Sequence, residues 1–357
     1  MLSTKRICII GSGNISNTRH IPAIRKNKNL EIVGIVSNEI KNLERTKSKY
    51  KFIKNSLLID TKIDILEQLN NVSWFRGVDA AIIGTPPREH YEISKACLQL
   101  KKHVLVEKPM AIDVDQCNEM IECAKQNSVT LNVMHSFSYA DGIKKMENRF
   151  RKGELGELGS ILEIQLTNRD RRLPKWYNDL PLGLFFDEAA HFFYTAMRFG
   201  NGNDYSVLNA HAQYGAIKEN TPQHLEVQGN VGETPVQMYM NFNSPVCEWV
   251  LLLICSKKIA IYDFFKDIFF VVDNDKNHLA LDVLRSSIQY TVGFWRGFIT
   301  NGFKMVANQL LYGHDKAINK FIESTETKNN SMYLSAEMGK KVVAAMNHVV
   351  NLAGRTQ

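Results

Sequence analysis

The sequence predicts an α/β protein in two parts: an N-terminal doubly wound parallel sheet, and a C-terminal α/β domain with an open, mainly antiparallel sheet. Three observations support this fold class. Short apolar segments alternate with helical segments in the first third of the chain, as in a parallel sheet covered by helices. A glycine-rich turn follows the first apolar segment. From about residue 160, strand-like segments follow one another without intervening helices.

The N-terminal elements follow from apolar runs and their boundary residues. We predict strands at 5–10, 30–37, 78–84, 103–106 and 129–134. We predict helices from the glycine turn to about residue 26, and at 39–50, 88–100 and 113–126. Asp113 is the expected N-cap of the last of these. Buried strands that alternate with helices indicate a doubly wound sheet.

The C-terminal elements are mostly strands. We predict them at 160–167, 225–229, 236–242, 249–254 and 258–262, with helices at about 280–311 and 335–351. The last helix is amphipathic, and we expect it to pack back on the N-terminal domain. The predicted domains are therefore 1–135 and 136–334, with 335–357 as a returning C-terminal helix.

Composition limits the class of protein. The chain has 357 residues, more than one ordinary core needs, with 44% hydrophobic and 23% charged residues. Its net charge of +7 is spread along the chain, which argues against nucleic-acid binding. The six cysteines form no CxxC pair, so we expect reduced thiols and a cytoplasmic protein. The longest apolar run is far below the ~20 residues of a spanning helix.

The turn Gly11-Ser12-Gly13-Asn14-Ile15-Ser16 lies between the first strand and a helix. Glycines at the first two positions let the chain turn tightly and bring backbone N–H groups to a pyrophosphate, where the helix N-terminus adds positive potential. Ser16 replaces the third glycine and is small enough for close helix packing. We interpret the turn as the dinucleotide-binding loop of a Rossmann domain; a simple strand-to-helix turn is the alternative.

The end of the second strand is expected to contact the adenosine ribose. An acidic residue there favours the 2′-OH and repels a 2′-phosphate, whereas this chain has Ser37 and Asn38, followed by Lys41 and Arg45. We therefore favour NADP(H) slightly over NAD(H). The alternative is that Ser37 and Asn38 bind an unphosphorylated ribose.

Six motifs occur in a characteristic order. They are GSGNIS at 11–16, RHIPAI at 19–24, GTPPREH at 84–90, EKP at 107–109, GELGELGSI at 153–161, and Asp187 with His191. Together they resemble the glucose–fructose oxidoreductase / inositol dehydrogenase / rhizopine catabolism family, Gfo/Idh/MocA. The resemblance spans nearly the whole chain. It implies a Rossmann domain plus an α/β domain whose open sheet forms the substrate site and often an oligomer interface.

The resemblance also implies roles for individual residues. Those implied for the pyrophosphate are Gly11, Gly13, Asn14 and Ile15. Those implied for the cofactor groove are Thr85, Pro86 and His90. Glu107 would lie near the nicotinamide ribose and Lys108 at the oxygen of the reacting carbon, while Asp187 and His191 would complete the site. Ser16, Ser37 and Ala189 depart from the family pattern.

These residue types suit hydride transfer, which needs a group that exchanges a proton with the substrate oxygen. His191 has an ordinary pKa near ~6.5 and is the better acid/base. Lys108 could polarise the oxygen as a cation or act as a base after desolvation. Asp187 precedes His191 by four residues, so the two share one helical face and the carboxylate can orient the imidazole. No metal site is predicted.

The segment 168–181 carries arginines beside Trp176 and Tyr177. Arginine suits phosphate or carboxylate and aromatic rings suit a sugar face, so Arg169, Trp176 and Tyr177 are candidate substrate ligands; a solvated basic loop is the alternative. We expect an NAD(P)-dependent oxidoreductase acting on a secondary alcohol or ketone of a sugar, nucleotide sugar or cyclitol. A glycoside-cleaving enzyme with tightly bound, recycled NAD and a non-catalytic dinucleotide-binding sensor are the alternatives.

An apolar stripe at steps of three and four runs through 288–310, from Ile288 to Leu310. Arg285, Arg296 and Lys304 accompany it, and no acid occurs between Asp282 and Asp315. Such a helix can lie on a membrane surface, but we favour core packing or a subunit interface. The expected partners are a small sugar-like substrate and further copies of the chain.

Overall fold

The computed structural model describes residues 4–215, 220–275, 277–307, 309–327 and 329–354. They form two compact units. The first contains the described residues up to Ser136 and those between His314 and Ala344; the second contains those between Phe137 and Gly313 and those from Ala345 onward.

The first unit is built on six parallel strands in the order β3-β2-β1-β4-β5-β6. The strands are β1 (Lys5–Ile10), β2 (Leu30–Ser37), β3 (Asn55–Leu58), β4 (Ala80–Ile83), β5 (His103–Val106) and β6 (Leu131–Val133). This order confirms the predicted doubly wound sheet. The sequence pattern does not predict β3, because it is a partly exposed edge strand that lacks a buried apolar run.

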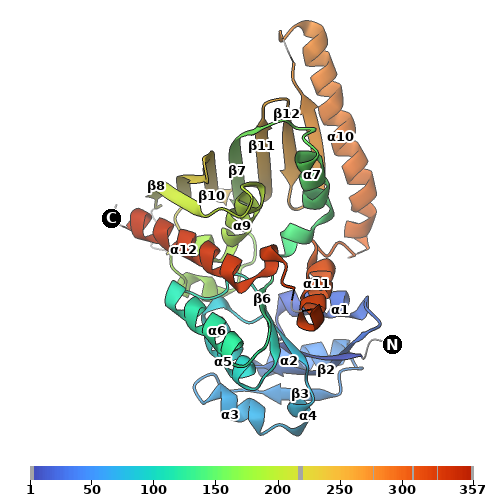
Figure 1. Ribbon diagram of the computed structural model, residues 1–357, viewed down its shortest axis with the longest axis vertical. Helices are drawn as coiled ribbons and strands as arrows, with labels where there is room; N and C mark the ends of the chain where they lie inside the picture. The colour runs from blue at the N-terminus through green and yellow to red at the C-terminus, as the bar shows by residue number, and fades with distance from the viewer. Residues whose placement is uncertain (1–3, 216–219, 276, 308, 328, 355–357) are drawn as a thin grey trace. The chain divides into compact units, whose positions relative to one another are not determined.

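Helices flank this sheet (Figure 1). They are η1 (Ser16–His20, a π-helical turn), α1 (Ile21–Arg25), α2 (Ile40–Lys49), α3 (Ile65–Asn70), α4 (Ser73–Arg76), η2 (Pro87–Glu89), α5 (His90–Gln99), α6 (Val114–Gln126), α11 (His314–Thr327), η5 (Met332–Leu334) and the first half of α12 (Ala336–Ala353). A 3₁₀ turn, η3 (Ser136–Tyr139), follows β6 at the boundary between the units. Asp113 caps α6 as predicted, because its carboxylate accepts a hydrogen bond from the Gln116 amide at 2.8 Å.

The return of the chain to the first unit begins at His314, whereas the sequence analysis placed residues 314–334 in the second domain. The apolar face of α11, formed by Ala317, Ile318 and Phe321, is buried, and the helix packs on α1 and β5. An amphipathic pattern indicates that a helix covers a core, but it does not indicate which of the two cores the helix covers. Only the fold supplied this assignment.

The second unit is built on seven strands in the order β13-β12-β11-β7-β10-β9-β8. They are β7 (Leu158–Asn168), β8 (Tyr205–Gln213), β9 (His224–Val231), β10 (Thr234–Ser244), β11 (Glu248–Cys255), β12 (Lys258–Asp263) and β13 (Ile268–Asp273). Only the β7–β10 pair is parallel among these described strands, so the mainly antiparallel sheet is confirmed. Its helices are α7 (Asp141–Arg151), η4 (Lys175–Asp179), α8 (Leu184–Glu188), α9 (Ala190–Phe199) and α10 (Ala280–Val306).

The long helix α10 packs beside the edge strand β13 (Figure 1). Its apolar stripe points to solvent: Ile288 is 53% exposed, Ile299 58% and Phe303 78%. Of the two explanations favoured from the sequence, core packing is therefore wrong for the stripe along the helix, although Leu310, beyond the helix, is buried; a subunit interface stays a prediction. Among the described helices, none combines the length and apolarity needed to span a membrane.

Candidate functional site

The strand order of the first unit reverses between β1 and β4, and ligands of doubly wound sheets bind at the carboxyl ends of strands at such a point. The predicted cofactor loop follows β1, and the GTPPREH segment follows β4. Gly11 has a φ of +100°, and a Cβ on it would lie 2.5 Å from the Gly84 carbonyl oxygen. Both features require glycine, so the two loops pack backbone against backbone.

The cofactor loop has room on its outer side. A Cβ on Gly13 would meet no atom within 4 Å, so the backbone there is open to a ligand. Asn17 fixes the backbone of the loop, because its Nδ2 donates to the carbonyls of Ser12 and Gly13, both at 2.9 Å. On the facing loop, Thr85 Oγ1 is buried without a hydrogen-bond partner. An open backbone and an orphaned hydroxyl fit a polar ligand such as a dinucleotide.

The end of β2 holds a carboxylate that the sequence analysis did not assign. Ser37 is buried, and its hydroxyl accepts from Ser12 Oγ at 2.6 Å, so it ties β2 to the cofactor loop. Asn38 donates from Nδ2 to Glu89 Oε1 at 2.7 Å. Glu89 Oε2 is buried without a partner, and burial raises the pKa of this carboxyl, opposed by the bond from Asn38. The acid absent from the end of β2 is thus supplied by the loop after β4.

His90 lies between the GTPP turn and the EKP turn and is fully buried. Its Nδ1 lies 2.8 Å from the Pro109 carbonyl and its Nε2 lies 2.9 Å from the Thr85 carbonyl. Burial lowers the pKa of His90 despite these two carbonyls. The imidazole therefore links the GTPP turn to the EKP turn.

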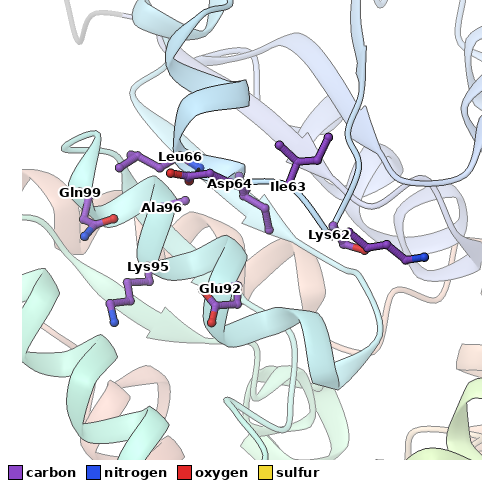
Figure 2. A pocket seen from close by; sticks show the side chains of 10 residues that line it. Lys62, Ile63, Asp64, Leu66, Glu92, Lys95, Ala96 and Gln99 are labelled. Atoms are coloured by element: carbon purple, nitrogen blue, oxygen red, sulfur yellow. Dashed lines mark hydrogen bonds between the residues drawn. The ribbon is translucent and has the colours of Figure 1, made fainter.

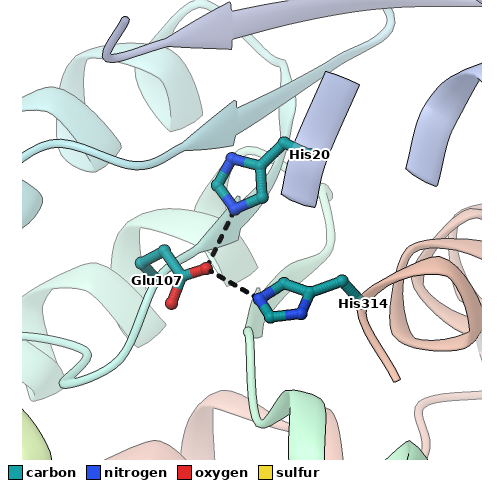
Figure 3. A group of neighbouring side chains, drawn as sticks. All are labelled: His20, Glu107 and His314. Atoms are coloured by element: carbon teal, nitrogen blue, oxygen red, sulfur yellow. Dashed lines mark hydrogen bonds and ion pairs between the residues drawn. The ribbon is translucent and has the colours of Figure 1, made fainter. Parts of the chain in front are cut away.

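Glu107 lies in a cluster with two histidines (Figure 3). His20 Nε2 donates to Glu107 Oε1 at 2.9 Å, and His314 Nε2 lies 3.6 Å from the same oxygen. The other oxygen, Oε2, accepts from the Lys108 amide at 3.2 Å. Burial would raise the pKa of Glu107, but the contacts with His20 and His314 outweigh it and hold the pKa well below its usual value.

Burial lowers the pKa of His20, so we treat its imidazole as neutral. Its Nδ1 then accepts from Ser16 Oγ at 3.4 Å while Nε2 donates to Glu107. Ser16, at the third position of the cofactor loop, is thus part of the chain of contacts that fixes the EKP turn. From the sequence, His20 is distinguished only as part of the RHIPAI motif, and no local pattern indicates His314.

The three side chains of this cluster are also of the types that bind metal ions, and the sequence predicted no metal site. Their ligand atoms lie within 4.8 Å of one another. The 2.9 Å contact is a normal hydrogen bond, and together with the Lys108 amide it gives both carboxylate oxygens a donor. We therefore interpret the cluster as a hydrogen-bonded anchor for the EKP turn.

In the second unit, Asp187 and His191 lie where α8 passes into α9. Ala189 between these helices keeps helical backbone angles, so the two side chains keep the predicted four-residue spacing on helical backbone. The imidazole of His191 packs edge-on against Phe137, with ring centroids 4.9 Å apart. Its Nδ1 lies 2.7 Å from the hydroxyl of Tyr194.

Tyr194 fixes the tautomer of His191. Its hydroxyl accepts a hydrogen bond from the Phe137 amide at 3.2 Å, so we assign its own proton to the bond with His191 Nδ1. The imidazole proton then resides on Nε2. The sequence signal for Tyr194 is its position one helical turn after His191.

The candidate substrate-binding residues of the basic segment 168–181 differ in their contacts and burial. Arg171 forms an ion pair with Glu188, a buried residue of α8, so Arg171 has a structural partner. Arg169 is exposed, and its Nε lies 3.7 Å from Oδ1 of the neighbouring Asp170. Trp176 and Tyr177 are half-buried on η4.

A cavity of about 400 Å³ lies in the first unit between the start of α3 and one face of α5 (Figure 2). Its lining includes Asp64, Glu92 and Lys95. None of the predicted site residues lines it, so this cavity is separate from the predicted cofactor groove.

The strand order, the glycine loop and the facing Thr85 define the class of the first unit: a dinucleotide-binding Rossmann domain. Residues 5–135 match the family model GFO_IDH_MocA, described as "Oxidoreductase family, NAD-binding Rossmann fold". The match assigns residues 5–135, which lie in the first unit, to the NAD-binding Rossmann domain of this oxidoreductase family.

Two curated relatives show how far the likeness extends. The chain is 34% identical over 117 residues to 1-carboxy-3-chloro-3,4-dihydroxycyclohexa-1,5-diene dehydrogenase of Comamonas testosteroni, over 32% of this chain and 30% of the relative. It is 30% identical over 159 residues to glucose-6-phosphate 3-dehydrogenase of Bacillus subtilis, over 44% of this chain and 41% of the relative. The chain thus spans less than half the length of these two relatives.

The fold likeness covers the whole chain. GenD2 from gentamicin A biosynthesis, solved in complex with NAD, matches with a TM-score of 0.77 at 13% identity, over 100% of this chain and 96% of that one. At this identity the match establishes the fold of both units.

Proposed function

We propose that the protein transfers a hydride between a nicotinamide cofactor and a secondary alcohol or ketone of a sugar, nucleotide sugar or cyclitol. The observation that carries the proposal is the anchoring of the EKP turn beside the cofactor loop, by His90 and by the His20–Glu107 contact. The sugar-like substrate class is supported by the relative that acts on glucose 6-phosphate by name. Arg169, Trp176 and Tyr177 remain the proposed substrate ligands.

When bound, the nicotinamide ring supplies or takes the hydride. The residues of the chain stabilise the charge and exchange the proton at the substrate oxygen. Lys108 donates a hydrogen bond from its ammonium group to that oxygen and stabilises the negative charge that develops there during ketone reduction. His191 donates a hydrogen bond from Nε2–H to the same oxygen. The proton that the oxygen gains in ketone reduction comes from the Lys108 ammonium, which becomes an amine, and in alcohol oxidation the Lys108 amine takes that proton back. Asp187 orients the imidazole or holds a neighbouring hydroxyl. These roles rest on the family resemblance of the two motifs.

The proposal is tested with the purified chain by measuring NADH and NADPH binding and then screening sugars, nucleotide sugars and cyclitols at 340 nm. We expect reversible cofactor binding and stoichiometric reduction or oxidation with at least one of them. Glycoside cleavage without net cofactor turnover would instead support an enzyme with recycled NAD. Cofactor binding with no turnover across the screen would support a sensor.

The preference between NAD(H) and NADP(H) is expected to depend on the charge of the Glu89 carboxylate. Its carboxylate lies beside Asn38 at the end of β2, where a negative charge disfavours a 2′-phosphate. We therefore propose a preference for NAD(H), against the slight preference for NADP(H) inferred from the sequence. The variant Glu89→Gln should improve NADPH affinity relative to NADH by about tenfold, the effect of removing a like charge at close range.

Isothermal titration of both cofactors against this variant and the wild type measures the ratio. Glu92→Gln is the matched control, because Glu92 is an exposed residue of α5 that lines the separate cavity. An unchanged NADPH:NADH ratio in Glu89→Gln would rule out this role of Glu89.

Tyr194 is expected to act as a positioning residue for His191. The variant Tyr194→Phe removes the hydroxyl that fixes the Nδ1 side of the imidazole, so kcat should fall about five- to tenfold, the value of one hydrogen bond. The pH dependence of kcat should shift as well, since His191 loses its fixed tautomer. Tyr205→Phe is the control, because the Tyr205 hydroxyl is buried without a partner. An unchanged pH profile in Tyr194→Phe would mean that Tyr194 serves packing alone.

A further inference from the structure

The helix α10 carries its apolar side chains on the outside of the second unit. Leu281 is 79% exposed, Phe303 78% and Val306 87%. The full set, which we call the outer stripe, follows helical steps of three and four: Leu281, Leu284, Ile288, Val292, Trp295, Ile299, Phe303 and Val306. At 1.5 Å per residue the helix is about 40 Å long. An exposed apolar surface of this length marks an interaction site.

The packing of α10 on the sheet holds the outer stripe outward. The inner side of the helix is small or polar: a Cβ on Gly293 would lie 2.7 Å from Phe270, and one on Gly297 would lie 2.5 Å from Ile268. Asn301 donates to the Asp267 carbonyl at 2.7 Å. Rotating the helix to bury its stripe would break this bond and force bulky side chains against β13. The outward direction is therefore specified by the sequence of the inner side.

The charges on α10 indicate what covers the stripe. Arg285 and Arg296 are eleven residues apart, so they lie on the same side of the helix, beside the stripe. Both are exposed, and the chain carries no acid between Asp282 and Asp315. Arg285 lies 3.2 Å from Asp273 of the sheet, which leaves Arg296 as the cation nearest the middle of the stripe.

A second copy of the chain matches this surface poorly. Pairing two outer stripes about a two-fold axis would bring the arginine flanks together, and residues 283–314 offer no carboxylate to neutralise them. A layer of lipid phosphates complements the arginines, and the acyl region accepts the stripe. Trp295 at the centre of the stripe is of a residue type favoured at the boundary between lipid headgroups and acyl chains.

We propose that α10 binds the surface of a bilayer containing anionic phospholipids, with the outer stripe in the headgroup–acyl boundary and the arginines at the phosphates. The helix lies along the surface and does not cross it. This inference does not depend on the hydride-transfer proposal.

The test is flotation of the full chain with vesicles of phosphatidylcholine alone and with one quarter phosphatidylglycerol. We expect binding to the mixed vesicles, weaker binding to phosphatidylcholine alone, and weaker binding to the mixed vesicles in 1 M salt. Phe303→Glu should reduce the partition coefficient at least tenfold, because it places a charge in the apolar boundary. Arg296→Gln should reduce binding to the mixed vesicles only.

Ser287→Glu is the matched control. Ser287 is exposed on the same helix, but it lies about 110° around the helix from the middle of the stripe, on the flank opposite to Arg296, so binding should fall far less than in Phe303→Glu. Both substitutions are at exposed positions, and a circular dichroism melt checks that each variant folds. Equal vesicle binding by wild type and Phe303→Glu would overturn the proposal. So would a wild-type dimer that binds no vesicles and that Phe303→Glu dissociates, which would identify the stripe as a subunit interface.

Discussion

Replacing Lys108 with Met is expected to lower kcat by about 10²- to 10⁴-fold, the usual contribution of a positioned proton-transfer or charge-stabilising group. Cofactor affinity should change little, because the backbone contacts that hold the turn remain. The Lys108 amide donates to Glu107 Oε2, and the Pro109 carbonyl contacts His90. The side chain is thus removed from a turn that stays in place.

The measurement is a steady-state comparison of kcat and KM with the substrate found in the screen, together with a cofactor titration. Lys101→Met is the control, since Lys101 is an exposed lysine shortly before β5. His191→Asn should show a similar loss of kcat, with His211→Asn, at an exposed position of β8, as its control. Wild-type kcat in both Lys108→Met and His191→Asn would refute the proposed chemistry.

Replacing Glu107 with Ala is expected to lower the free energy of unfolding by about 3 kcal/mol, because it leaves buried donors without the charged acceptor that they share. The affected donors are His20 Nε2 and the Lys108 amide. Glu119→Ala is the control, since the carboxylate of Glu119 is exposed and pairs with Lys95 at the surface. That variant should unfold almost as the wild type does.

The pH dependence follows from the lowered pKa of Glu107. A carboxyl whose pKa is lower in the folded state contributes stability that is fully present above its unfolded-state value near 4.5. This contribution is lost as the pH falls through the folded-state pKa. Urea unfolding at pH 7, 5.5 and 4 should therefore show the same difference between wild type and Glu107→Ala at the two higher values and a smaller one at pH 4. A difference confined to pH values below 6 would instead assign the stabilisation to protonated histidines.

The sequence predicted the features that depend on neighbours along the chain. Apolar runs and turn residues located five of the six strands of the first sheet, because a buried parallel strand must be apolar along its length. The glycine loop and its position after β1 were predicted for the same local reason, since Gly11 needs a positive φ and lies against another backbone. The Asp113 cap and the mainly antiparallel second sheet were also read directly from the residues.

Contacts between distant segments were decided only by the tertiary structure. His314 joins His20 and Glu107 across almost 300 residues, and Glu89 supplies at the end of β2 a carboxylate that belongs to another loop. The outer stripe of α10 gave the same periodic signal as a core helix, because periodicity reports one apolar face and not what covers it. The need for glycines and for Asn301 on its inner side could be recognised only from the structure, because it depends on the position of β13 against the helix. Local sequence thus determined the elements of this protein, while the packing of one element on another decided which side chains share a site and which face solvent.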